Sequence, residues 1–115
     1  MTLAEPIIIH TEEAAIEVLC RGTDGPLALM LAFGTRGGRD FDHLAGALVE
    51  RGWRTAAVNR RGVGNSRGPM TGITLHDLAA DAAGVIEHLD GAPAALIGHA
   101  FGNREARCLA CDRPD

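Results

Sequence analysis

Apolar residues repeat along the chain with two different periods, and each change of period marks the boundary of a predicted element. Short apolar or β-branched runs predict five strands, at residues 7–10, 15–20, 27–31, 53–59 and 94–97. The runs at 27–31 and 94–97 are continuously apolar, which is expected of strands that are covered on both faces in a parallel sheet.

Three other segments repeat apolar residues at intervals of three and four, which predicts helices. The first begins after an N-cap at Asp40 and continues to about residue 52. The second covers residues 75–89, where Thr74 and Asp77 have the spacing of a capping box. The third covers about residues 101–111.

Strands that alternate with helices favour an α/β fold with a mostly parallel sheet and flanking helices. The sequence contains no repeat, linker or low-complexity tract, so we expect residues 1–115 to belong to one domain.

The composition excludes several functional classes. The 115 residues include no Lys, Tyr or Gln, and Ser66 is the only serine. Without a lysine amine the chain cannot be a phosphate-loop NTPase, a kinase or a Schiff-base enzyme. A net charge of −4 and only four aromatic residues argue against a nucleic-acid partner.

Nothing in the sequence indicates a membrane partner or a secretory signal. The longest apolar run has seven residues, whereas a helix needs roughly 20 to cross a bilayer. An odd number of cysteines, three, suggests reduced thiols. We therefore expect a cytoplasmic protein.

The junction of the last strand and the last helix carries the most specific motif. Residues 98–102 are Gly-His-Ala-Phe-Gly. A strand, a sharp turn and a helix form the context of the G-x-S-x-G nucleophile elbow, in which flanking glycines hold the central residue in a strained conformation. Ala100 occupies that central position, between His99 and Phe101.

On this motif the chain resembles the N-terminal half of an α/β-hydrolase-fold protein, in a Gly-His-Ala variant similar to aminoacrylate or carbamate hydrolases. Residues 27–34 are similar to the family's strand and oxyanion loop. Residues 59–66 are similar to its D-x-R-G-x-G-x-S turn, with Asn59 in place of the aspartate. The resemblance implies an oxyanion hole made by the amides of Gly34 and Phe101, and a small-molecule ester, amide or carbamate as substrate.

Three departures limit what the resemblance implies. Ala100 has only a methyl group and cannot attack a carbonyl. Residues 31–34 are Leu-Ala-Phe-Gly, where many relatives have His-Gly. The family's catalytic acid and histidine follow the nucleophile, yet no histidine follows Ala100. We therefore expect a partial domain, truncated after the elbow helix and inactive as it stands, with a bare sheet edge that favours self-association.

Three interpretations of the function stay open. The chain is part of a hydrolase whose remaining half supplies the histidine and the acid, or a non-catalytic relative that binds a small molecule or a partner, or an inactive fragment. The interpretations differ in the expected length of the native product and in the solubility of the chain.

Other candidate residues favour structural roles. Cys108 and Cys111 form a C-x-x-C inside a helix, and we expect core cysteines rather than a redox or zinc site. No metal or cofactor is expected. His99 is expected to support the turn, with a direct chemical role as the alternative. The remaining histidines are expected at the surface: His10, His43, His76 and His88.

The turn that contains Ser66 and the loop arginines each have a structural and a functional interpretation. Ser66 lies in a glycine-rich turn, where a hydroxyl commonly bonds the local backbone instead of acting as a nucleophile. The glycines of that turn lack the spacing of a dinucleotide fingerprint. Five loop arginines are expected to be solvated and paired with Asp40 and Asp42, although they could instead bind an anionic substrate: Arg36, Arg39, Arg60, Arg61 and Arg67.

Overall fold

The computed structural model describes residues 4–32 and 34–115. The described residues form five strands, three α-helices and one 3-10 helix. In chain order these are β1 (Glu5–His10), β2 (Ala15–Arg21), β3 (Leu27–Leu31), η1 (Gly38–Phe41), α1 (Asp42–Glu50), β4 (Arg54–Val58), α2 (Leu75–His88), β5 (Ala95–Gly98) and α3 (Phe101–Asp112).

The strands form one sheet in the order β1-β2-β4-β3-β5. β3 pairs in parallel with β4 on one side and with β5 on the other, whereas β2 is antiparallel to both β1 and β4. Only β2 therefore runs against the other four strands. The predicted α/β fold with a mostly parallel sheet is confirmed, with one reversed strand near the β1 edge.

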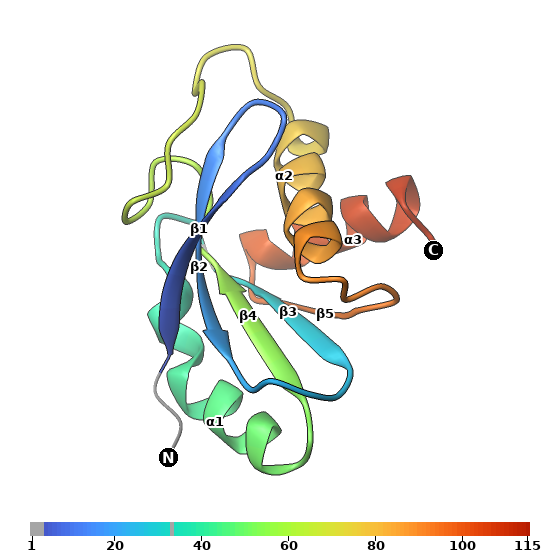
Figure 1. Cartoon of the computed structure of the whole chain (residues 1–115). Helices are drawn as coiled ribbons and strands as arrows, with labels where there is room; N and C mark the ends of the chain where they lie inside the picture. The colour runs from blue at the N-terminus through green and yellow to red at the C-terminus, as the bar shows by residue number, and fades with distance from the viewer. Residues whose placement is uncertain (1–3, 33) are drawn as a thin grey trace.

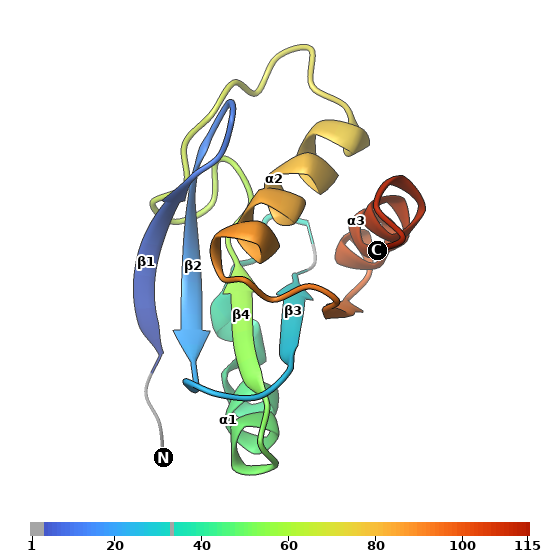
Figure 2. The same ribbon diagram turned by 45° about the vertical axis from the view of Figure 1, so that its right-hand side comes forward.

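Helices cover both faces of the sheet (Figure 1). α1 covers one face, where it packs on a small cluster of buried residues: Leu19, Met30, Ala32, Phe41, Ala45 and Ala57. α2 and α3 cover the other face over a larger cluster that includes Ile16, Leu29, Val58, Val85 and Leu109. Figure 2 shows the sheet between these two layers. Among the described residues, no helix combines the length and the apolar character needed to cross a membrane.

Two predicted elements are confirmed in detail. β3 has the predicted bounds and is buried at every position, as its continuous apolar run indicated. α2 begins with the predicted capping box, because the Thr74 amide donates to Asp77 Oδ2 at 2.7 Å and the Asp77 amide donates to Thr74 Oγ1 at 3.4 Å. Local sequence determines both features.

Two other predictions are wrong. Asp40 does not cap α1; its carboxylate accepts from Arg36 Nη2 at 2.9 Å, and Phe41 is the N-cap, with no side-chain hydrogen bond. β5 is not a buried strand, since none of its residues is fully buried and Ala95 is exposed. Within the described residues β5 pairs only with β3, so its other edge is bare. Self-association through that edge stays a prediction.

Candidate active site

β5 and α3 meet at a sharp turn centred on Ala100. Ala100 has φ +54° and ψ −111°, a conformation that costs a residue with a Cβ about 1–3 kcal/mol. The His99 amide donates to the carbonyl of Leu31 at 3.0 Å and so fixes the turn to β3. The strained conformation predicted for this elbow is present, although alanine occupies it.

Two glycines make the turn possible because the backbone approaches itself closely there. A Cβ on Gly98 would overlap the carbonyl oxygen of Gly102, and a Cβ on Gly102 would overlap the carbonyl oxygen of Leu31. These neighbours are backbone atoms, which cannot swing away as a flexible side chain could. The two glycines of the motif are therefore required by packing.

The elbow and the loop that contains Gly34 lie at the same end of the sheet. Leu31 and Gly98 are register partners in the parallel pair β3 and β5, so both following loops leave the sheet side by side. Gly34 has φ +43°, His99 and Ala100 are exposed, and Phe101 is half-buried. Phe33, part of the altered oxyanion segment, lies outside the described residues. The oxyanion role of the Gly34 and Phe101 amides stays a prediction.

Arg60 connects the loop that contains Gly34 to the helix after the elbow, a role that the sequence did not indicate. Its guanidinium donates to the carbonyls of Ala32 (2.6 Å) and Gly34, and its Nε donates to Glu105 Oε1 at 2.7 Å. The guanidinium carbon also lies 5.0 Å from the centre of the Phe101 ring. Arg60 thus holds the carbonyls on both sides of the Gly34 amide and connects them to the elbow helix.

Glu105 is a buried charge partner, with a side chain only 2% exposed. Burial raises the pKa of Glu105, and the neighbouring Arg60 opposes that rise. Glu105 lies on the apolar face of α3 with Gly102 and Leu109, all three buried. A buried charge on an apolar helix face needs a partner of opposite charge. The position of Glu105 on that face therefore indicated such a partner, but the sequence does not say which residue it is.

The expectation of solvated loop arginines is partly wrong. Arg36 pairs with Asp40, and Arg39 lies 3.9 Å from Asp42, as predicted. Arg60 and Arg61 are instead mostly withdrawn from solvent. Arg61 Nε and Nη2 donate to the Asp81 carboxylate at 2.7 and 3.1 Å, and this hydrogen bonding raises the pKa of Arg61. These two arginines are committed within the chain, because they pair with acidic side chains of α3 and α2.

Asn59 acts as both donor and acceptor at the end of β4. Its Oδ1 accepts from the Gly38 amide at 2.7 Å, and its Nδ2 donates to Glu17 Oε1 at 2.9 Å. Glu17 also accepts from the amide of Asn65 at 3.0 Å, and this bond lowers the pKa of Glu17 most. An aspartate at position 59 would face Glu17 with a second carboxylate, which gives a physical reason for asparagine here.

Ser66 is fully buried, and its hydroxyl is occupied on both sides. Its Oγ donates to the Asn59 carbonyl at 2.5 Å and accepts from the Glu17 amide at 2.8 Å. The prediction that this hydroxyl bonds the backbone is confirmed. A hydroxyl with no access to a substrate cannot be the nucleophile.

The expectation of core cysteines is wrong for Cys111, which is exposed, while Cys108 is half-buried. Both lie near the C-terminal end of α3. His76 is at the surface, as expected, but the structure places it beside Cys108 and Asp112. His76 is 32 positions from Cys108, so no spacing in the sequence indicated this group.

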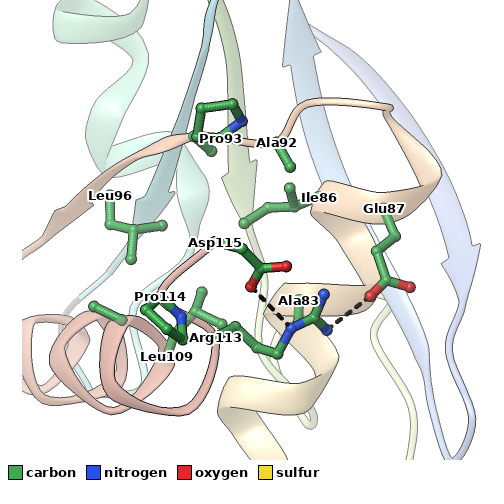
Figure 3. A pocket seen from close by; sticks show the side chains of 12 residues that line it. Ala83, Ile86, Glu87, Ala92, Pro93, Leu96, Leu109, Arg113, Pro114 and Asp115 are labelled. Carbon is green, nitrogen blue, oxygen red and sulfur yellow. Dashed lines mark hydrogen bonds and ion pairs between the residues drawn. The ribbon is translucent and has the colours of Figure 1, made fainter.

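An apolar pocket lies elsewhere, between α2, β5 and α3 (Figure 3). Apolar side chains such as Ile86, Leu96 and Leu109 form part of its wall. Arg113 closes one side, where Nη1 lies 2.8 Å from Glu87 Oε1 and Nε lies 3.4 Å from Asp115 Oδ1. None of the predicted site residues lines this pocket, so it is separate from the elbow.

Comparisons with known proteins agree with the observed fold. Residues 29–115 match the family described as alpha/beta hydrolase fold. A 2-(acetamidomethylene)succinate hydrolase from Mesorhizobium japonicum is 38% identical over 79% of this chain, and a protein from Variovorax paradoxus named as a carbamate hydrolase is 33% identical over 76%. The structure of an epoxide hydrolase from an endophytic Streptomyces superposes with a TM-score of 0.91 and 30% identity over 97% of this chain.

The matched regions are a minor part of those proteins. They cover 32% of the M. japonicum relative, 34% of the V. paradoxus relative and 34% of the epoxide hydrolase. The chain thus spans about a third of the length of these proteins.

Proposed function

The chain belongs to the alpha/beta hydrolase fold family, and from that premise we propose that it forms the elbow and oxyanion-binding part of a hydrolase of small-molecule esters, amides or carbamates that uses no side-chain nucleophile at position 100. The names of the two relatives give an acetamido compound and a carbamate as their substrates, which supports this substrate class.

One observation carries the proposal: the elbow keeps its strained geometry although Ala100 cannot attack a carbonyl. This geometry includes the strain at φ +54° and the close backbone approach at Gly98 and Gly102. It gives the methyl group of Ala100 no reactivity. The turn does, however, begin α3 directly after β5, whose register partner β3 leads into the loop that contains Gly34. The first amides of α3 therefore lie at the same end of the sheet as that loop. We propose that this placement of amides is the function that the turn serves here.

In the proposed site the substrate carbonyl oxygen lies between the amides of Gly34 and Phe101. Hydrogen bonds from these amides stabilise the negative charge that develops on that oxygen, and the N-terminus of α3 adds a favourable dipole. Water is the attacking group in this proposal, because a methyl group at Ala100 cannot form an acyl-enzyme. The remaining half of the hydrolase supplies the base that takes the water proton and returns it to the leaving group. Arg60 positions the Gly34 amide through the flanking carbonyls.

The test combines binding and turnover on the 115-residue chain. Acetate serves as the oxyanion probe in a ¹⁵N amide titration, where we expect the resonances of Gly34 and Phe101 to move most. The Ala110 amide, near the other end of α3, is the internal control. With p-nitrophenyl acetate we expect no p-nitrophenolate release above buffer and no acetylated protein by intact mass.

Two results would contradict the proposal. One is an acetate titration that leaves the Gly34 and Phe101 amides unmoved. The other is turnover that disappears in His99→Ala or Ser66→Ala, since it would show a side chain acting as nucleophile or base. Ala100→Ser alone should not create turnover, because a serine nucleophile needs a general base and no histidine lies among the described residues that follow Ala100.

A further inference from the structure

The start of α2 and the end of α3 lie beside each other in Figure 2. Three side chains that can bind a metal converge there. His76 is the second residue of α2, and Cys108 and Asp112 lie one turn apart in α3. One ligand atom from each side chain falls within 4.8 Å of the other two. The three residues are 32 or more positions apart across the two helices, so the fold alone assembles the group.

The distances between these atoms resemble those around a tetrahedral ion. Cys108 Sγ lies 3.4 Å from His76 Nδ1 and 3.6 Å from Asp112 Oδ2. Tetrahedral zinc, with its usual bond lengths to sulfur, nitrogen and oxygen, places such pairs about 3.5 Å apart. The third pair, His76 Nδ1 and Asp112 Oδ2, is 2.7 Å apart because the two atoms share a hydrogen bond. That pair must separate by roughly 0.6 Å to reach tetrahedral geometry.

We propose that His76, Cys108 and Asp112 form a binding site for a Zn²⁺-like dication, with water in the fourth position. A thiolate, an imidazole and a carboxylate together suit Zn²⁺ better than they suit Mg²⁺ or Ca²⁺, which prefer oxygen ligands alone. The ion would connect α2 to α3 at the surface, independently of the hydrolase chemistry proposed for the elbow.

Metal binding at this group releases protons. Desolvation, with the Asp112 charge adding to it, raises the pKa of the Cys108 thiol, and the hydrogen bond to Asp112 raises the pKa of His76. Asp77 and Cys111 are the other titratable groups that act on the cluster. Zinc ligation needs a thiolate and a neutral imidazole, so binding of the ion displaces the protons of these side chains.

The experiment titrates the reduced 115-residue chain with Co²⁺ and then displaces it with Zn²⁺. We expect one equivalent of Co²⁺ to give visible d–d bands of a tetrahedral site and a near-ultraviolet thiolate-to-cobalt band, and Zn²⁺ to abolish both. Cys108→Ser should remove the thiolate band. His76→Ala should weaken Co²⁺ binding by at least about tenfold. The His76 side chain is exposed, so its removal should leave the fold intact.

Cys111→Ser is the matched control, because Cys111 is the other thiol of the same helix but lies outside the converging group. It should keep the thiolate band, and circular dichroism should show every variant folded. A thiolate band that persists in Cys108→Ser, or that disappears in Cys111→Ser alone, would overturn the site. As a second measurement, excess Zn²⁺ should raise the thermal unfolding midpoint of the wild-type chain and not that of Cys108→Ser.

Discussion

Polar groups at the loop end of the sheet and polar groups at the outer ends of α2 and α3 are arranged in opposite ways. At the loop end, Arg60, Glu105 and Asn59 are largely withdrawn from solvent, and their side chains bond the backbone or each other. At the helix ends, His76 and Asp112 are exposed and bond each other.

This difference in burial determines what each region can do. A buried charge is costly unless it is paired, so a buried pair holds the surrounding backbone in one geometry. An exposed pair contributes little to stability, and solvent already competes for its atoms. The first arrangement suits the fixed placement of amides that we propose for the elbow. The second leaves ligand atoms available for exchange with an ion.

The largest expected effect comes from breaking the buried pair. Arg60→Ala leaves Glu105 buried without its partner and should lower the free energy of unfolding by about 3 kcal/mol in urea denaturation. The folded-state pKa of Glu105 is already raised and should rise further, so the loss should be greatest at neutral pH and shrink as pH falls toward the ordinary glutamate value.

Arg36→Ala is the matched control for that variant, because it breaks the exposed pair with Asp40. It should leave the unfolding free energy close to that of the wild type. Equal losses in the two variants would remove the distinction between the buried and the exposed region.

The second effect tests why Asn59 stands where the family turn has aspartate. Asn59→Asp should lower stability by about 2 kcal/mol at neutral pH, because two carboxylates then face each other. The loss should shrink as pH falls and one carboxylate takes a proton. Asn65→Asp, at a more exposed donor to Glu17, should lose less. A loss that does not depend on pH would contradict carboxylate repulsion as its cause.

In the wild-type chain, the contribution of Glu17 to stability should also depend on pH. The pKa of Glu17 is lowered in the folded state, chiefly by the Asn65 amide. Its contribution to stability is therefore present above the ordinary glutamate pKa and is lost as pH falls through the folded value.

A smaller effect concerns the strain at the elbow. Ala100→Gly should raise the unfolding free energy by about 1 kcal/mol, because glycine adopts a positive φ without steric cost. Ala110→Gly, at an exposed position inside α3, should lower it by about 1 kcal/mol. Opposite signs in thermal or urea unfolding would separate backbone strain from helix propensity; the same sign in both variants would count against strain at Ala100.

The smallest expected effect is a change in stability and pKa at the exposed pair of His76 and Asp112. The hydrogen bond to Asp112 raises the pKa of His76, so its contribution to stability is complete below the ordinary histidine pKa and is lost as pH rises through the folded value. An NMR titration of Asp112→Asn should show the His76 pKa lower than in the wild type. An unchanged pKa would mean that the contact does not persist in solution.

The sequence predicted what depends on neighbouring residues and missed what depends on the fold. The capping box of α2 and the burial of β3 follow from local pattern, and both are confirmed. Arg60 and Glu105 are 45 positions apart, and no periodicity pairs them. β5 was predicted to be buried because its residues are apolar, yet it pairs with one strand among the described residues and remains partly exposed.

The position of the chain's single serine has a practical consequence for how this protein is detected. Covalent reporters of serine hydrolases, such as fluorophosphonates, need an accessible hydroxyl beside a base. Ser66 has no solvent access, and its hydroxyl already donates to the Asn59 carbonyl and accepts from the Glu17 amide. Activity-based profiling should therefore pass over this chain even where it is abundant and fully folded.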